Sequence, residues 1–382
     1  MDFESLFDIP IDDLHTPCYL TDARLLQKNT ALLKQIQQRT GCKILLAQKA
    51  FSMFSAYPLI RDDLAGTTAS GLFEAKLGRE HFGKEVHVFS PAYTQEDFTQ
   101  LLELCDHIVF NSFGQWKKYR QQVQDATRNI SCGIRINPGY AEVETDLYNP
   151  CISGSRMGVP LEQMEDDFAG LDGILFHTMC EQNSDVLERT LDHMLPQFDK
   201  CLKRCKWVNF GGGHHITRPD YDVERLVRCI ERVRDTYGVQ VYLEPGEAVA
   251  LNAGYLVATV LDVVHNGMDI AILDASAACH MPDVLEMPYR PHILYSGTAG
   301  EKTHTYRLAG NTCLAGDVIG DYSFDHQLQS GEKLVFCDMA IYSMVKNNTF
   351  NGVPLPDIAL YQNGHIDLVK RFGYADFEGR LS

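Results

Sequence analysis

The hydrophobic pattern of the chain repeats a short strand and an amphipathic helix. Eight runs are rich in apolar and β-branched residues, at 42–50, 65–70, 86–92, 107–112, 133–138, 173–180, 207–213 and 239–246. Helical segments, with apolar residues every three or four positions, accompany them, most clearly at 22–40, 72–81, 184–205 and 219–237. This alternation predicts an α/β fold, in which eight parallel strands close into a (β/α)8 TIM barrel.

The pattern changes after Gly246. Short β-rich runs follow one another without long helices between them, at 249–264, 270–276, 305–310 and 333–343. Such runs are typical of an antiparallel β domain. We therefore expect a barrel over residues 15–250 and a C-terminal antiparallel β domain over residues 251–382, together with residues 1–14.

Composition narrows the class of protein. Hydrophobic residues make up 45% of the 382 residues and charged residues 22%, which is typical of a folded, soluble chain. Acidic residues outnumber basic ones by 51 to 34. This excess disfavours nucleic acid and anionic membranes as partners and favours a cationic small molecule.

The cysteines and the N-terminus indicate a reducing compartment. The 12 cysteines are scattered and form no CxxC pair, so we expect neither disulfides nor structural zinc. The acidic start of the chain lacks the basic and apolar regions of a signal peptide, and the most apolar run, 248–264, contains Asn252 and Asp262. A cytoplasmic location without a membrane span is therefore expected.

Reactive and polar residues follow the predicted strands. Because chemistry in such barrels collects where the carboxyl ends of the strands meet, these residues are expected to form one site. They are Lys49, Ser70, Tyr93, Asn111, Arg135, His177, the run Gly211, Gly212 and Gly213, and Glu244.

Each of these residues also has an ordinary structural explanation. Lys49 ends an apolar strand, which favours a neutral amine for Schiff-base chemistry, but taken alone a snorkelling lysine at the barrel rim is the more common explanation. The glycine run suits a phosphate and also suits a tight turn. Glu244 fits a partner for a ring nitrogen or a salt bridge to Arg135, and His177 fits a stacking ring, a base or a core histidine.

Other sites are disfavoured by spacing. His214 and His215 are adjacent, so their side chains diverge, and no metal site is expected. The chain has neither a GxGxxG start nor a GxxxxGK[ST] motif, which argues against the common nucleotide-binding loops.

The motifs AQKA, TTAS, RINP, FH, GGG and EPG, with a later TC and FNG, occur in this order along nearly the whole chain. In this set the sequence resembles the fold-type III pyridoxal-phosphate decarboxylases, the alanine-racemase-like family that includes ornithine and diaminopimelate decarboxylases. Longer strings, at 177–182, 211–217, 279–291 and 312–324, resemble the branch of this family that decarboxylates carboxynorspermidine and carboxyspermidine.

The resemblance implies a role for each residue around pyridoxal 5′-phosphate. Lys49 would attach the cofactor covalently, His177 would stack on its ring and Glu244 would pair with its nitrogen. Further cofactor contacts would come from Ser70, Arg135, Gly211, Gly212, Gly213 and Tyr342. Cys313 would protonate the carbanion in the site of the other subunit, so a homodimer with shared active sites is implied.

Departures from the ornithine-type pattern suit a polyamine substrate. Glu247 stands where those relatives carry an arginine, and Leu314 stands where they place an acid. Recognition of the substrate amines is therefore assigned to the acidic residues Glu247, Asp283, Glu286 and Asp317. The same fold also suits a decarboxylase of a smaller amino acid, such as diaminopimelate or ornithine, a racemase, or a regulatory protein that binds the cofactor without chemistry.

Overall fold

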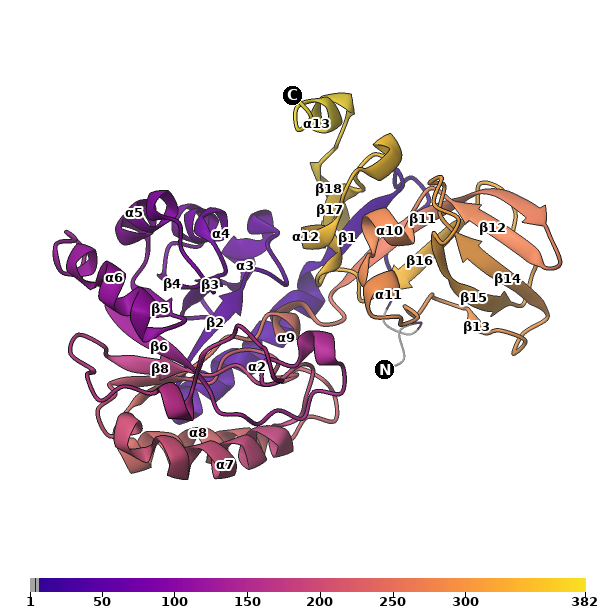
Figure 1. Cartoon of the computed structure of the whole chain (residues 1–382). Coiled ribbons are helices and arrows are strands. Elements are labelled where there is room, and N and C mark those ends of the chain that lie inside the picture. The colour runs from indigo at the N-terminus through magenta and orange to yellow at the C-terminus, as the bar shows by residue number, and fades with distance from the viewer. Residues whose placement is uncertain (1–3, 5–6) are drawn as a thin grey trace. The chain divides into compact units, whose positions relative to one another are not determined.

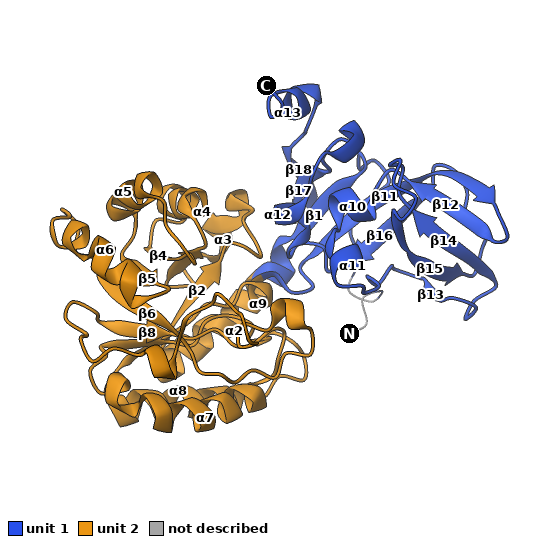
Figure 2. Ribbon diagram, viewed as in Figure 1, with its two compact units in different colours: residues 1–26, 250–382 blue, residues 27–249 orange. Residues whose placement is uncertain are grey.

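The computed structural model describes residue 4 and residues 7–382, which divide into two compact units (Figures 1 and 2). Unit 2 contains residues 27–249, and unit 1 contains the described residues up to 26 together with 250–382. Unit 1 is thus built from both ends of the chain.

Unit 2 is a closed barrel of eight parallel strands. In hydrogen-bonded order they run β5-β4-β3-β2-β10-β9-β8-β6, and pairing of β5 with β6 closes the ring. The strands are β2 (Lys43–Ala47), β3 (Gly66–Ala69), β4 (Glu85–Phe89), β5 (His107–Phe110), β6 (Ser131–Asn137), β8 (Gly173–Leu175), β9 (Trp207–Asn209) and β10 (Gln240–Leu243). The short strand β7 (Val159–Pro160) pairs with β6. Each of the eight predicted runs overlaps one barrel strand, so the predicted barrel is confirmed.

Helices connect the barrel strands, and α7 and α8 lie side by side outside the barrel (Figure 1). They are α2 (Ala23–Thr40), α3 (Tyr57–Ile60), α4 (Leu72–Leu77), α5 (Gln95–Leu104), α6 (Phe113–Gln124), α7 (Ser184–Leu202), α8 (Val223–Tyr237) and α9 (Glu247–Ala250). Polar side chains start several of them: Ser112 accepts a hydrogen bond from the Gln115 N–H at the start of α6, and Asp222 accepts one from the Arg225 N–H at the start of α8. Helix α8 ends at Gly238, whose φ of 68° suits glycine.

A layer of large side chains fills the barrel interior, formed by Leu45, Val109, Leu175, Trp207 and Tyr242. The indole of Trp207 fits there because its neighbours across the sheet, Gly133 on β6 and Gly173 on β8, have no side chains. A Cβ atom at Gly173 would lie 2.1 Å from the Trp207 ring, and one at Gly133 would lie 2.3 Å from it. The glycines and the tryptophan are therefore matched in volume.

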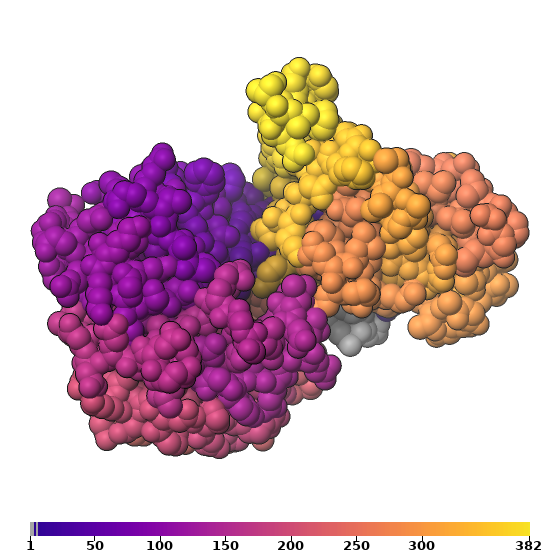
Figure 3. Space-filling view, in the orientation of Figure 1, coloured from indigo at the N-terminus to yellow at the C-terminus, as the bar shows by residue number. Residues whose placement is uncertain are grey.

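Unit 1 is built around a nine-stranded sheet, with the order β13-β15-β14-β12-β11-β1-β17-β18 and with β16 paired to β11. Its strands are β1 (Cys18–Asp22), β11 (Gly254–His265), β12 (Asp269–Leu273), β13 (Gly297–Thr298), β14 (His304–Ala309), β15 (Val318–Phe324), β16 (Lys333–Cys337), β17 (Asp357–Gln362) and β18 (His365–Lys370). Its helices are α10 (Ala277–His280), α11 (Asp283–Glu286), α12 (Ser343–Lys346) and α13 (Tyr374–Glu378). The C-terminal residues, yellow in Figure 3, project from this unit.

Both faces of the sheet are buried near its centre. On β11, Leu256 and Ala258 join one apolar cluster, whereas Tyr255 and Val257 join another. On β1, Tyr19 and Leu20 divide in the same way. Alternate residues of a strand point to opposite faces, so each central strand supplies two cores.

The β domain differs from its prediction in two respects. The sheet is mixed, because β1 pairs in parallel with β17 and β12 pairs in parallel with β14. Parallel neighbours need a crossover, which α10 and α11 provide between β12 and β14. In addition, β1 lies within the range 15–250 assigned to the barrel, but its partners β11 and β17 belong to unit 1.

All 12 cysteines are free. Among the helices formed by the described residues, none is both long enough and apolar enough to cross a membrane.

The packing around Trp207 predicts that Gly173→Ala lowers the free energy of unfolding by about 1–3 kcal/mol, because the methyl group would overlap the indole. The measurement is urea-induced unfolding followed by circular dichroism. Gly114→Ala is the matched control, since its nearest neighbour, Ser112 Oγ, would be 3.6 Å away. The control should be neutral or stabilising by about 0.5–1 kcal/mol, and equal effects of both substitutions would contradict the prediction.

Candidate active site

A pocket lies where the carboxyl ends of the barrel strands meet. Its lining combines one amine, one guanidinium, one carboxylate and one imidazole with small and apolar side chains. The lining residues are Ala47, Lys49, Thr68, Ala69, Ser70, Phe89, Arg135, Leu175, His177, Gly212 and Glu244. Six of the strand-end residues predicted from the sequence are in this lining, namely Lys49, Ser70, Arg135, His177, Gly212 and Glu244. The other four are not, namely Tyr93, Asn111, Gly211 and Gly213.

The strands place these side chains at the same level of the barrel. Lys49 lies two residues beyond β2, and Ser70 and Glu244 directly follow β3 and β10. His177 lies two residues beyond β8, and Arg135 lies within β6. Parallel strands in a closed ring bring these distant positions together.

Lys49 has an amine suited to nucleophilic chemistry. Solvent reaches its side chain through the pocket, but protein surrounds it, and this desolvation lowers the pKa of the amine. The positive charge of Arg135 lowers the pKa further, whereas Glu244, Cys180 and Glu74 act in the opposite direction. A lowered pKa increases the fraction of neutral amine, which is the form that attacks a carbonyl carbon.

Glu244 is held in place by the neighbouring strand. Asn209, the last residue of β9, donates a hydrogen bond of 2.7 Å from Nδ2 to Glu244 Oε1. The other end of the same amide, Asn209 Oδ1, accepts a hydrogen bond of 2.8 Å from the Gly211 N–H. One buried amide therefore fixes both the carboxylate and the start of the glycine run.

Arg135 is a buried cation within the same wall. Burial lowers the pKa of its guanidinium to about 10, although Glu244 acts to raise it. The guanidinium lies over the Phe89 ring, 4.6 Å from its centroid, and Nη2 donates a hydrogen bond of 3.2 Å to the His177 carbonyl. No salt bridge between Arg135 and Glu244 is formed in the described structure, so the two groups interact through space.

His177 is a neutral ring with a defined tautomer. Burial, together with the charges of Lys49 and Arg135, lowers its pKa well below the ordinary value. Its Nδ1 accepts a hydrogen bond of 2.6 Å from the Gly212 N–H. Because a backbone N–H only donates, Nδ1 carries no proton, and the proton of the neutral ring is on Nε2.

The glycine run is required by close packing and by backbone conformation. Gly211 and Gly213 have φ values of 71° and 81°, which favour glycine. A Cβ atom at Gly213 would lie 2.0 Å from the Met179 carbonyl oxygen. The N–H groups of Gly211 and Gly212 already donate to Asn209 and His177, so a phosphate could bind these two groups only by displacing those partners.

Glu247 lies three residues after Glu244 and begins α9. Its Oε1 is 3.7 Å from His215 Nε2. Burial lowers the pKa of His215 to about 4, so this contact does not join two charges near neutral pH. Burial raises the pKa of the Cys180 thiol, Glu181 and Glu247 act in the same direction, and Lys49 acts to lower it.

The remaining predicted residues belong to unit 1. Cys313 is exposed, and its N–H donates a hydrogen bond to Asn351 Oδ1. Tyr342 precedes α12 with a φ of 55°. Asp283 and Glu286 both form ion pairs with the Lys346 ammonium group.

Asp317 has a structural role in this unit. It is 2% exposed, and its carboxylate accepts hydrogen bonds from Ser276 Oγ, the Ala278 N–H and Thr312 Oγ1. These bonds engage both carboxylate oxygens, which does not favour the substrate-binding role expected from the sequence.

Three residues near the pocket were not selected from the sequence. Asn209 donates a hydrogen bond to Glu244. Glu74 and Cys180 both act to raise the pKa of Lys49. Asn209 directly precedes the motif FGGG at a strand end, so its position could have identified it. Glu74 lies on α4, where its carboxylate accepts a hydrogen bond from the Ser70 N–H, and no pattern in the sequence distinguishes it from a solvated helix residue.

Comparison with known proteins identifies the family. Residues 18–340 match the family described as pyridoxal-dependent decarboxylase, C-terminal sheet domain. The chain belongs to this family of pyridoxal-dependent decarboxylases. Within it, the chain is 42% identical to a carboxyaminopropylagmatine decarboxylase from Synechocystis, over 97% of this chain and 96% of the relative.

Other pyridoxal-dependent decarboxylases match over a similar length. The chain is 41% identical to a carboxynorspermidine/carboxyspermidine decarboxylase from Campylobacter jejuni, over 97% of this chain and 99% of that protein. A crystal structure of carboxynorspermidine decarboxylase from Campylobacter jejuni, in complex with norspermidine, matches with a TM-score of 0.89 and 40% identity, over 96% of this chain and 100% of that chain. A diaminopimelate decarboxylase from Helicobacter pylori, at 18% identity and a TM-score of 0.83 over 97% and 98% of the two chains, shares the fold.

The pocket has the chemical groups that pyridoxal 5′-phosphate requires. Lys49 offers an amine with a lowered pKa to an aldehyde, and Glu244 offers a carboxylate, positioned by Asn209, to a ring nitrogen. His177 offers a neutral aromatic ring in the same pocket. These residues fit the cofactor of the family.

We predict that Asn209→Ala weakens binding of pyridoxal 5′-phosphate roughly 10- to 100-fold, because it removes a hydrogen bond to a charged carboxylate. The measurement is a titration of the cofactor-free protein followed by absorbance. Asn111→Ala is the control: this amide also follows a barrel strand but contacts the backbone of Arg156 and Gly158. Unchanged affinity in Asn209→Ala would show that Asn209 does not position Glu244.

Proposed function

We propose that this chain catalyses the pyridoxal 5′-phosphate-dependent decarboxylation of carboxynorspermidine and carboxyspermidine. The products are norspermidine or spermidine and CO2, which is a reaction of polyamine biosynthesis. The observation that carries the proposal is the similarity to the Campylobacter jejuni decarboxylase over nearly the full length of both chains. The excess of acidic over basic residues in the chain, 51 to 34, suits a cationic substrate.

Three residues of the pocket would hold the cofactor. Lys49 would attach it covalently, Glu244 would keep its ring nitrogen protonated, and His177 would pack against its ring. When bound, pyridoxal 5′-phosphate supplies an electron sink for the pair of electrons that remains after CO2 leaves. Asn209 keeps the Glu244 carboxylate in position, and Ser70 and Arg135 line the same pocket.

Further contacts are proposed on the basis of the family resemblance. Tyr342 and the run from Gly211 to Gly213 would contact the phosphate. Cys313 would return a proton to the carbanion in the site of the other subunit of a homodimer. Its exposed position on unit 1 is consistent with a residue that reaches a partner.

The substrate amines require acidic partners. Glu247 is the leading candidate, because it begins α9 three residues after the pocket residue Glu244 and stands where ornithine-type relatives carry an arginine. Asp283 and Glu286 are further candidates, since a substrate ammonium group could replace the ammonium group of Lys346, which has the same charge. Asp317 is the weakest of the four predicted acids because its carboxylate is already satisfied.

A second candidate substrate is carboxyaminopropylagmatine, on which the 42% identical Synechocystis relative acts by name. It ends in a guanidinium group, whereas the carboxypolyamines end in an ammonium group. Guanidinium binds a carboxylate through two parallel hydrogen bonds, whereas ammonium binds it as a point charge. The geometry of the acidic residues that bind the far end of the substrate therefore determines which of the two substrates is preferred. Diaminopimelate decarboxylases are more distant, at 21–24% identity among the relatives compared.

We predict that purified protein with pyridoxal 5′-phosphate releases CO2 from carboxynorspermidine or carboxyspermidine with a higher kcat/KM than from carboxyaminopropylagmatine, diaminopimelate or ornithine. Lys49→Ala should abolish CO2 release and also covalent labelling of the chain by the cofactor after borohydride reduction, measured by mass spectrometry. Lys49→Arg is the charge-preserving control and should lose both. Turnover by either variant would disprove the role of Lys49, and a preference for carboxyaminopropylagmatine would favour the second candidate.

For Cys313, we predict that Cys313→Ala keeps the cofactor but loses most product formation, because the proton donor is gone. If the active sites are shared between subunits, a mixture of Lys49→Ala and Cys313→Ala chains, dissociated and reassembled, should recover part of the activity. Such mixed dimers contain one site with both residues intact. Absence of recovery in assembled mixed dimers would contradict sharing, and an unchanged rate in Cys313→Ala would remove its proposed role.

A further inference from the structure

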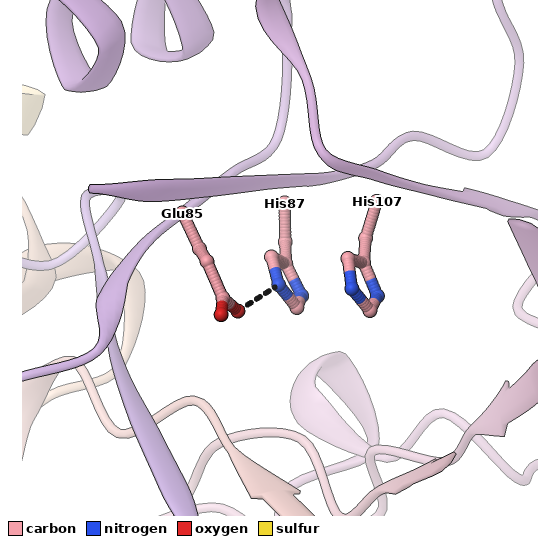
Figure 4. A group of neighbouring side chains, drawn as sticks. All are labelled: Glu85, His87 and His107. Carbon is pink, nitrogen blue, oxygen red and sulfur yellow. Dashed lines mark hydrogen bonds and ion pairs between the residues drawn. The ribbon is translucent and has the colours of Figure 1, made fainter. Parts of the chain in front are cut away.

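Two histidines and a glutamate meet inside the barrel at the amino ends of β4 and β5. Glu85 and His87 are separated by one residue on β4, so their side chains point to the same face. His107 begins β5 and is the direct cross-strand neighbour of His87. The ligand atoms of all three lie within 4.8 Å of one another, and Figure 4 shows the three side chains in a row on one side of the strands.

Two of the three groups, Glu85 and His107, are in the protonation states that a metal ion requires. Burial acts to raise the pKa of Glu85, but hydrogen bonds from His87 and Lys43 lower it to about 2, so the carboxylate is ionised. Burial, followed by the proximity of His87, lowers the pKa of His107 to about 2, so this imidazole is neutral. Metal ligands must be deprotonated, and Glu85 and His107 meet that condition near neutral pH.

One nitrogen of the cluster has no partner within the described structure. His107 Nδ1 is inaccessible to solvent and makes no hydrogen bond. An unsatisfied buried polar atom is unfavourable by about 1–3 kcal/mol. By contrast, His87 Nε2 lies 3.2 Å from Glu85 Oε2, with the two imidazole rings stacked at 3.9 Å.

An ammonium group occupies the position next to the carboxylate. Lys43 Nζ forms an ion pair with Glu85 and lies 3.3 Å from the hydroxyl oxygen of Tyr242. The Lys43 side chain is 38% exposed, so it can leave the cluster for solvent. A cation held by a partly exposed carboxylate is replaceable by a cation of higher charge.

We propose that Glu85, His87 and His107 bind a divalent transition-metal ion of the Zn²⁺, Co²⁺ or Ni²⁺ type, in competition with the Lys43 ammonium group. Two imidazoles and one carboxylate favour these ions over Mg²⁺ or Ca²⁺, which prefer oxygen ligands. Bonds of about 2.0–2.2 Å need the ligand atoms closer together than they are now, so the imidazole rings must rotate to converge on the ion.

The proposed site is separate from the decarboxylase pocket and does not depend on the proposed function. Glu85, His107 and Lys43 are the first residues of β4, β5 and β2, whereas the pocket residues lie at or beyond the carboxyl ends of the strands. A metal ion there would join two neighbouring strands. Its expected effect is on the stability of the barrel, in keeping with the usual role of this end of the fold.

Trp207 provides a local readout for metal binding. Its ring lies 5.2 Å from the His107 ring, and Trp116 is the second tryptophan of the chain. In a tag-free Trp116→Phe background loaded with pyridoxal 5′-phosphate, Ni²⁺ should quench Trp207 fluorescence with a stoichiometry of one ion per chain. The Ni²⁺ titration gives the affinity.

Substitutions within the cluster test the assignment. His107→Gln should weaken the Ni²⁺-dependent quenching more than about tenfold, because one ligand is lost. Lys43→Met should tighten it about three- to tenfold, because the competing cation is gone. His265→Gln, at an exposed histidine paired with Asp269, is the matched control and should leave the affinity unchanged.

Three results would overturn the proposal: no quenching in the parent protein, equal quenching in His107→Gln, or no tighter binding in Lys43→Met. Circular dichroism melting establishes whether His107→Gln is folded. If it is not, the Lys43→Met measurement still decides, because that variant keeps all three ligands.

Discussion

Closure of the barrel through the pairing of β5 with β6 is the constraint on which the candidate site depends. Closure turns a linear series of strands into a ring, so residues from Lys49 to Glu244 reach one pocket although they lie far apart in the sequence. The interior must then be filled by side chains of matched size. Trp207 fills the space left by Gly133 and Gly173, which ties the geometry of the ring to a single large residue.

Within the pocket, burial and neighbouring charged groups set the pKa values of the ionisable side chains. Arg135 and Lys49 are two cations in one wall, and their proximity, with desolvation, lowers the pKa of both His177 and Lys49. Glu244 acts to raise the pKa of Lys49, and its carboxylate is held by the Asn209 amide. The pocket therefore combines an amine with a lowered pKa, a neutral imidazole and a carboxylate in a small volume, which is the combination that pyridoxal chemistry requires.

The strands could be predicted from the alternation of β-rich runs with amphipathic helices. The residues at their ends could be predicted because they directly follow those runs in the sequence. Glu74 could not be predicted, because its contact with Ser70 depends on how α4 lies against the barrel. The Glu85, His87 and His107 cluster was also missed, and no metal site was expected: the sequence shows EVHV and HIVF apart, and only the register of β4 and β5 joins them. The place of β1 in the sheet of unit 1 likewise depends on pairing with strands from the other end of the chain.

That arrangement of β1 has a consequence for synthesis on the ribosome. Cys18–Asp22 emerges early, but its partners, β11 and β17, are translated only after the whole barrel sequence. The barrel can close while β1 still exposes the edges of an apolar strand, and such edges are prone to intermolecular association. The yield of folded protein in the cell is therefore expected to depend on how quickly the last hundred or so residues are translated. It should also depend on chaperones that cover β1 until its partner strands have been made.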